Sequence, residues 1–174
     1  MTQPTNRTAG DCMNDTLTVL LGYDPPTCLV GRIIAWFTWG HRSHSKIAFI
    51  GQTETRVFES RSDVGVIERD PEPEGRDRLT DWHAVDLPRP IPARDFARAQ
   101  VGKGYDVPTW KFLRRPTHQG RIASGRWYCS ELCYQVCIEG GLYMLRVTES
   151  WKIAPAWLYA SPLQYGPVIP PWRM

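Results

Sequence analysis

The stretch Trp127-Tyr128-Cys129-Ser130-Glu131-Leu132-Cys133-Tyr134-Gln135-Val136-Cys137-Ile138-Glu139, followed by Gly140 and Gly141, decides the fold of this chain. Its apolar side chains and cysteines recur at helical spacing, and the polar pair Ser130 and Glu131 stands near its start. This pattern predicts a helix that begins near Cys129. The two glycines are expected to end the helix, since glycine favours the backbone conformation found just past a helix C-terminus.

Cys129 is the predicted nucleophile because it falls in the first turn of this helix. Unpaired backbone N–H groups and the positive end of the helix dipole stabilise a thiolate there, and the thiolate is the reactive form. The alternative is a small buried core residue, since free cysteine is among the most buried residue types. Cys133 and Cys137 follow on the same helix face and are expected to be structural. Cysteines in a row cannot surround an ion, so no metal site is expected.

A nucleophilic thiol needs a base, and two of the four histidines, His41 and His44, lie just before an apolar run. The run from His44 to Ile50 predicts a strand, and Thr55 to Ser60 predicts the next one. If the two strands pair as a hairpin, Glu59 comes close to His44 and accepts a hydrogen bond from its imidazole. The alternative for Glu59 is an exposed strand carboxylate. The spacing alone leaves His41 and His44 both open as the base.

Several short motifs, in this order, resemble the permuted NlpC/P60 papain-like enzymes of the YaeF/YiiX type. The motifs are His44-Ser45 before an apolar strand, Phe58-Glu59-Ser60, Gly65-Val66, Tyr105-Asp106 and Tyr128-Cys129-Ser130-Glu131-Leu132. The resemblance runs from about Leu29 to about Leu163. In ordinary papain-like hydrolases the cysteine helix precedes the histidine strand, whereas here the histidine comes first, so the order is circularly permuted. The resemblance favours His44 over His41 as the base.

The resemblance implies an α+β, papain-like fold in which a small antiparallel sheet carrying His44 and Glu59 packs on the helix that starts at Cys129. A Cys-His-Glu triad would then perform acyl transfer, with Glu59 orienting the imidazole. The backbone N–H of Cys129 is expected to bind the oxyanion together with a donor from Tyr128 or Tyr105. The resemblance also places Trp39 or Trp36 at the cleft, although core packing is the alternative role for each. Glu131 is expected to anchor the helix start.

The implied activity is that of a thiol amidase, peptidase or acyltransferase that needs no cofactor. Peptides, peptidoglycan fragments and acyl lipids are the substrate classes that the resemblance suggests. Two other functions stay open. One is a membrane-associated lipid acyltransferase or thioesterase, and the other is a non-catalytic binding module that kept the fold. The sequence indicates neither the acyl acceptor nor the oligomeric state.

Composition fits one globular domain over residues 16–174, preceded by a flexible N-terminal segment, residues 1–15. The 174 residues are 42% hydrophobic, and 21 basic against 18 acidic residues leave a net charge of +3. This small excess does not indicate nucleic-acid binding. The apolar run from Leu29 to Trp39 is too short to span a bilayer and predicts a short core helix. No signal peptide is evident, which favours a cytoplasmic protein, or a phage-associated one delivered by other means.

The remaining segments predict further elements around this framework. The expected elements are an edge strand at Thr16–Leu21, a strand at Val64–Arg69, a solvent-exposed loop at Asp70–Arg78, a strand at Trp82–Pro88, a helix at Ile91–Val101, a short helical or irregular piece at Thr109–Leu113, a strand at Val147–Thr148, a short helix within Ile153–Leu163 and an extended tail at Pro167–Met174.

Overall fold

A computed structural model describes residues 17–37, 40–106, 125–146 and 153–173 of the chain. Along the chain the elements are β1 (Thr18–Asp24), α1 (Leu29–Phe37), β2 (His44–Ile50), β3 (Thr55–Arg61), β4 (Gly65–Arg69), β5 (Asp81–Val85), α2 (Pro90–Ala99), β6 (Gly104–Tyr105), β7 (Arg126–Trp127), α3 (Cys129–Glu139), α4 (Pro155–Tyr159), β8 (Tyr165–Val168) and the 3-10 helix η5 (Pro171–Arg173). The predicted N-terminal segment, Trp39, Thr109–Leu113 and Val147–Thr148 lie outside the described residues.

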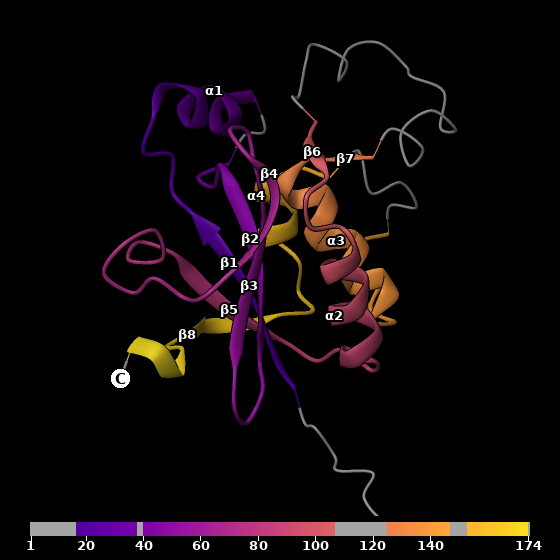
Figure 1. Cartoon of the computed structure of the whole chain (residues 1–174). Coiled ribbons are helices and arrows are strands. Elements are labelled where there is room, and N and C mark those ends of the chain that lie inside the picture. The colour runs from indigo at the N-terminus through magenta and orange to yellow at the C-terminus, as the bar shows by residue number, and fades with distance from the viewer. Residues whose placement is uncertain (1–16, 38–39, 107–124, 147–152, 174) are drawn as a thin grey trace, which may run out of the picture.

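Six strands form one antiparallel sheet in the order β4-β3-β2-β1-β5-β8, and helices pack against it (Figure 1). The fold class is therefore α+β, as the sequence predicts. The expected hairpin of β2 and β3 forms, with Lys46 opposite Glu59 and Ile47 opposite Phe58. A separate pair, β6 and β7, is parallel.

The larger hydrophobic core lies between one face of the sheet and α2 and α3. Strand side chains such as Ile47, Phe49 and Phe58 pack there against Leu132 and Val136 of α3. The helix begins at Cys129 and ends at Glu139, with Gly140 at its C-cap, as the sequence predicts. Eight of its residues are buried, because the sheet and α2 cover it on different sides.

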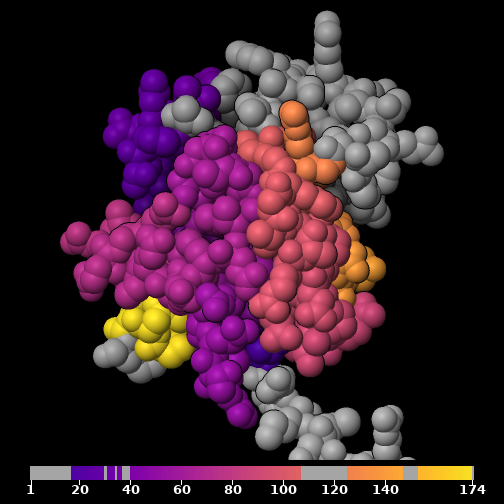
Figure 2. Space-filling model, in the orientation of Figure 1, coloured from indigo at the N-terminus to yellow at the C-terminus, as the bar shows by residue number. Residues whose placement is uncertain are grey.

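The opposite face of the sheet is covered by the segment between β4 and β5 and by the C-terminal residues. Leu20, Ala48, Val57 and Trp82 form a second apolar cluster, and Trp172 of η5 packs on it with its ring 5.2 Å from that of Trp82. Figure 2 shows the C-terminal residues, in yellow, directly beside the segment that follows β4. The sheet is thus buried on both faces.

Two predictions for this region are wrong. The strand expected at the edge is β1, which lies between β2 and β5, and its five consecutive buried residues fit a strand covered on both faces. The expected extended tail, Pro167–Met174, instead begins inside β8, the edge strand beside β5, and then forms the turn of η5.

Two further expectations are only partly met. The segment Asp70–Arg78 has no helix or strand, but its Asp77 is fully buried, which is possible because Arg69 and Lys46 pair with its charge. The predicted core helix forms as α1, yet its Leu29, Ile33 and Trp36 are 74%, 48% and 74% exposed.

Gly65, the first residue of β4, occupies a position that only glycine fits. Its φ is +78°, and a Cβ there would lie 2.2 Å from the carbonyl oxygen of Lys103. The close approach lets Val66 donate its N–H to that oxygen at 2.8 Å. This contact attaches the segment that leads to β6 and Tyr105 to the end of the sheet where His44 lies.

No helix among the described residues is long and apolar enough to cross a membrane.

Candidate active site

His44 and Glu59 lie at the same end of the sheet on neighbouring strands. His44 is the first residue of β2, and Glu59 stands near the end of β3, opposite Lys46. The Nε2 atom of His44 is 2.8 Å from Oε2 of Glu59. An ionised carboxylate can only accept, so Nε2 carries the proton and Nδ1 is left to face another group.

Cys129 occupies the first turn of α3 and is 1% exposed. Three hydrogen bonds hold the chain around it. Ser60 Oγ donates to the Trp127 carbonyl at 2.7 Å, Ser130 Oγ donates to the Ile153 carbonyl at 2.5 Å, and the Tyr128 N–H donates to Glu131 Oε2 at 3.3 Å. The last bond confirms the prediction that Glu131 anchors the helix start. The helix N-terminus is thereby fixed against β3 and against the segment that precedes α4.

His44 and Ser45, the next residue of β2, lie beside the Cys129 thiol and act on its pKa through charge and through hydrogen bonds. Burial alone would raise the pKa of the thiol, but the charge on His44 and these hydrogen bonds outweigh it and lower the pKa. Burial alone would also lower the pKa of His44. The thiolate of Cys129 and the hydrogen bond to Glu59 reverse that effect and raise the pKa to about 10. The two shifts together favour a thiolate beside an imidazolium.

Glu59 is 3% exposed and remains ionised because cations surround it. Burial alone would raise the pKa of its carboxyl group. The hydrogen bond and charge of His44, followed by the charges of Lys46 and Arg69, instead hold the pKa well below its usual range. At neutral pH the carboxylate is therefore available to stabilise a charged imidazole.

The two tyrosines predicted near the oxyanion lie beside Cys129. The rings of Tyr105, in β6, and Tyr128, the N-cap residue of α3, have centroids 5.8 Å apart. Burial first, and then the charge on Cys129, raises the pKa of both phenols, so both stay protonated and can donate. For Tyr128, hydrogen bonding to Cys129 raises the pKa of the phenol further. Trp39, the third residue predicted here, is outside the described residues.

The other cysteines of α3 differ from Cys129. Cys133 and Cys137 are fully buried on the same side of the helix, and burial raises the pKa of both thiols. They remain protonated at neutral pH, which fits the structural role predicted for them. In the part of the chain that the structure describes, no group of three or more His, Cys, Asp and Glu residues could hold a metal ion.

Sequence reasoning missed the residues that hold Glu59 in place. Arg69 Nε donates to Glu59 Oε1 at 2.7 Å, and Asp77 pairs with both Arg69 and Lys46. A signal for Arg69 existed, because the register of β3 and β4 places it diagonally across from Glu59. No such signal existed for Asp77, which comes from an irregular segment without periodicity.

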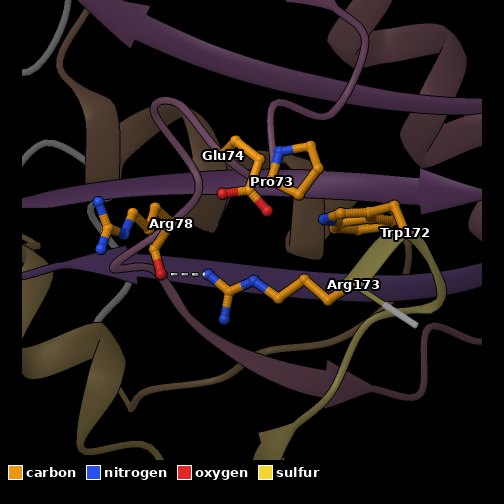
Figure 3. A pocket seen from close by; sticks show the side chains of 5 residues that line it. All are labelled: Pro73, Glu74, Arg78, Trp172 and Arg173. Carbon is orange, nitrogen blue, oxygen red and sulfur yellow. Dashed lines mark hydrogen bonds between the residues drawn. The ribbon is translucent and has the colours of Figure 1, made fainter.

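The second face of the sheet is the one opposite α2 and α3. Among the residues that cover it lies a pocket of about 520 Å³. Five residues line it, and none of them is Cys129, His44 or Glu59: Pro73, Glu74, Arg78, Trp172 and Arg173 (Figure 3). The Arg173 guanidinium donates to the Arg78 carbonyl oxygen at 2.8 Å, the dashed contact in Figure 3, and to the carbonyl oxygen of Thr80 at 3.3 Å. These bonds join the C-terminal residues to the segment that carries Asp77.

The geometry brings a thiol at a helix N-terminus, an imidazole and a carboxylate into one series, in which the imidazole is hydrogen bonded to the carboxylate. Such a series can generate a nucleophilic thiolate and can store and return a proton. A scan against models of protein families finds no match for this chain, and a search of curated proteins finds no relative.

Proposed function

We propose that this chain is a cysteine-dependent hydrolase or acyltransferase that acts on amide or ester bonds through Cys129, His44 and Glu59. The observation that carries the proposal is the position of His44, whose Nε2 lies 2.8 Å from Glu59 and whose charge lowers the pKa of the neighbouring Cys129 thiol. We further propose that the fold is a permuted papain-like fold of the NlpC/P60 type. The order of elements supports this, since the histidine strand β2 precedes the cysteine helix α3 in an antiparallel α+β framework.

In the proposed first half-reaction, the Cys129 thiolate attacks the substrate carbonyl carbon and forms a carbon–sulfur bond. The negative charge moves to the carbonyl oxygen, for which the Cys129 backbone N–H and the Tyr128 phenol are the proposed donors. When the tetrahedral intermediate collapses, the bond to the amine or alcohol breaks. The leaving group takes a proton from the His44 imidazolium, and a thioester remains on Cys129.

In the second half-reaction, water or another acceptor gives a proton to the neutral His44 and attacks the thioester carbonyl. The carbon–sulfur bond breaks, the acyl product leaves, and the thiolate and imidazolium are restored. Glu59 accepts a hydrogen bond from Nε2 throughout, so it keeps the ring oriented and stabilises its charged form. The choice between water and another acceptor sets hydrolysis against transfer.

Peptide amides, including cell-wall peptides, are the first substrate class that we propose. A lipid-like acyl ester is the second, and a specific observation favours it. Leu29, Ile33 and Trp36 of α1 recur at helical spacing and are largely exposed, in the helix that precedes the histidine strand along the chain. An acyl chain is a ligand that such an apolar surface suits. Peptidoglycan fragments and p-nitrophenyl esters of increasing chain length, assayed side by side, separate the two classes.

The test of the reactive pair needs no substrate. Intact protein is treated with iodoacetamide over a pH series, and labelled sites are located by mass spectrometry. We expect one fast site, Cys129, that reacts well below the ordinary thiol pKa, while Cys133 and Cys137 stay unlabelled in the folded state. Cys129→Ala removes the fast site, and Cys28→Ser, a change at an exposed thiol, is the matched control.

Uniform slow labelling of all thiols would contradict the proposed chemistry. A fast Cys129 whose Ala variant keeps the biological effect of the protein would instead favour a binding module that retained a reactive thiol.

A further inference from the structure

Charged side chains of alternating sign form a connected series that starts at the candidate active site and runs across the second face of the sheet. In order, its members are the thiolate of Cys129, the imidazolium of His44, Glu59, Arg69, Asp77, Lys46 and Asp24. The series also turns back on itself, because Asp24 in β1 is the register partner of His44. Each charged group within the series therefore lies between two groups of opposite charge.

Arg69 fixes the orientation of the Glu59 carboxylate. Its Nε donates to Glu59 Oε1 at 2.7 Å, while the other oxygen, Oε2, faces His44 at 2.8 Å. With both oxygens engaged from different directions, the carboxylate cannot rotate without breaking one short contact. Because Arg69 binds Oε1, Oε2 is the oxygen that faces the imidazole.

Asp77 in turn fixes Arg69. The two terminal nitrogens of Arg69 reach the two carboxylate oxygens of Asp77, each at 2.8 Å, in the two-point geometry that arginine forms with a carboxylate. Asp77 also accepts from Lys46 Nζ at 3.0 Å and from the Glu72 N–H at 2.8 Å. Gly22 leaves the room for Lys46, since a Cβ at that position would lie 2.9 Å from the lysine side chain.

Burying so many ions is a poor way to gain stability. Asp77 is 0% exposed and Lys46 is 1% exposed, and each buried charge loses its hydration. Well-packed apolar side chains of similar volume often serve stability as well or better. The arrangement does supply a rigid carboxylate at one defined place, which is the requirement of a third group that orients a histidine.

We propose that Arg69, held by Asp77, is a positioning residue that sets the Glu59 carboxylate against His44 and so maintains the reactive state of Cys129. This inference rests on the proposed function, because it assigns Arg69 a part in that same site. Arg69 touches neither Cys129 nor His44 in the described contacts, and it acts through Glu59.

The test is the pH profile of Cys129 alkylation in Arg69→Met. Loss of Arg69 removes a cation and frees Glu59 to turn, and both effects weaken the stabilisation of the thiolate. The charged groups around Glu59 are His44 and Lys46 from β2, Arg69 from β4 and Asp77 from the segment after β4. We expect the acidic limb of the profile to move up by at least about one pH unit. Arg56→Met, which breaks an exposed pair with Asp70, is the control and leaves the profile unchanged.

A double variant separates positioning from general loosening of the fold. Glu59→Gln already removes the carboxylate through which Arg69 acts, so adding Arg69→Met to it should produce little further shift. An equal shift on both backgrounds would contradict the proposal, since it would show that Arg69 acts by another route. The thermal unfolding of every variant is followed alongside, and the comparison is made at temperatures where all of them are folded.

The outcomes also distinguish this inference from the proposed function. If wild-type Cys129 shows no fast reaction, the proposed function fails first. If wild type reacts fast and folded Arg69→Met keeps the same profile, only the role of Arg69 is overturned. Should Arg69→Met fail to fold, Arg69→Lys decides. A single ammonium cannot hold both Glu59 and Asp77 at the observed points, so an unchanged profile in that variant contradicts the proposal.

Discussion

The three cysteines of α3 show how position on a helix decides the chemistry of one residue type. Cys129, Cys133 and Cys137 are all buried, but only Cys129 stands at the helix start beside His44 and Ser45. The pKa of its thiol is lowered, whereas burial raises the pKa of the other two. Burial by itself therefore argues against a reactive thiol, and the cation and hydrogen bonds at the helix start reverse its effect.

The two histidines that the sequence left open are separated by their surroundings. His41 is exposed, while His44 is bonded to Glu59. We expect His44→Ala to lower turnover of an activated ester by at least about a hundredfold, the usual contribution of a general acid–base group, with a smaller change in KM. His41→Ala is the matched control and should retain turnover. Steady-state kinetics on the two purified variants decides the assignment, and a larger loss in His41→Ala than in His44→Ala would reverse it.

At the scale of elements, α3 is fixed to the sheet by a bond that crosses from strand to helix start. Ser60 Oγ in β3 donates to the carbonyl of Trp127, two residues before Cys129. Ser60→Ala removes one of the two donors to this carbonyl, which keeps the Asp106 N–H at 3.1 Å, so the free energy of unfolding should fall by about 0.5–1.5 kcal/mol. Urea unfolding measures the change.

Ser62→Ala provides the comparison, because Ser62 is exposed just past the end of β3. Its free energy of unfolding should stay within about 0.5 kcal/mol of wild type. A similar cost for both serines would show that the bond to Trp127 does not stabilise the helix start.

Local signals explain which elements the sequence could predict. The span of α3 follows from helical periodicity and from Gly140 at its end, and the hairpin of β2 and β3 follows from two apolar runs joined by a short turn. Glu59 could be placed near His44 for the same reason, because hairpin register is a local property.

The parts that could not be predicted depend on contacts between distant segments. Asp77 is buried because Arg69 and Lys46 neutralise it, and β8 joins the sheet edge beside β5 from the far end of the chain. Arg173 binds the carbonyl of Arg78 across a sequence separation of 95 residues. Sequence periodicity does not predict such contacts. The segments that cover the second face, and the residues that hold Glu59 in place, could therefore not be predicted.

In the whole molecule, each face of the sheet contributes different groups to the site. The helix face supplies Cys129 on α3 together with the larger core. The opposite face supplies the charged series through Lys46, Arg69 and Asp77, covered by the segment after β4 and by η5. His44 and Glu59, at one end of the sheet, connect the two. We therefore expect a substitution on the face opposite α3 to change the reactivity of the Cys129 thiol.

This division predicts how stability depends on pH. The pKa values of Glu59 and Asp77 are both lowered in the folded protein, with burial opposing the shift and the neighbouring cations causing it. A carboxyl group of this kind stabilises the fold above its unfolded pKa, near 4, and the contribution is lost as the pH falls through the folded value. Glu59→Gln cannot titrate. It should be less stable than wild type at pH 7, and the difference in free energy of unfolding should narrow as the pH falls from 5 to 3.

Urea unfolding at each pH measures this gap, with the exposed Glu54→Gln as the control. A gap that stays constant down to pH 3 would mean that the charge of Glu59 contributes nothing to folding, and the paired network would then owe its place to the site alone.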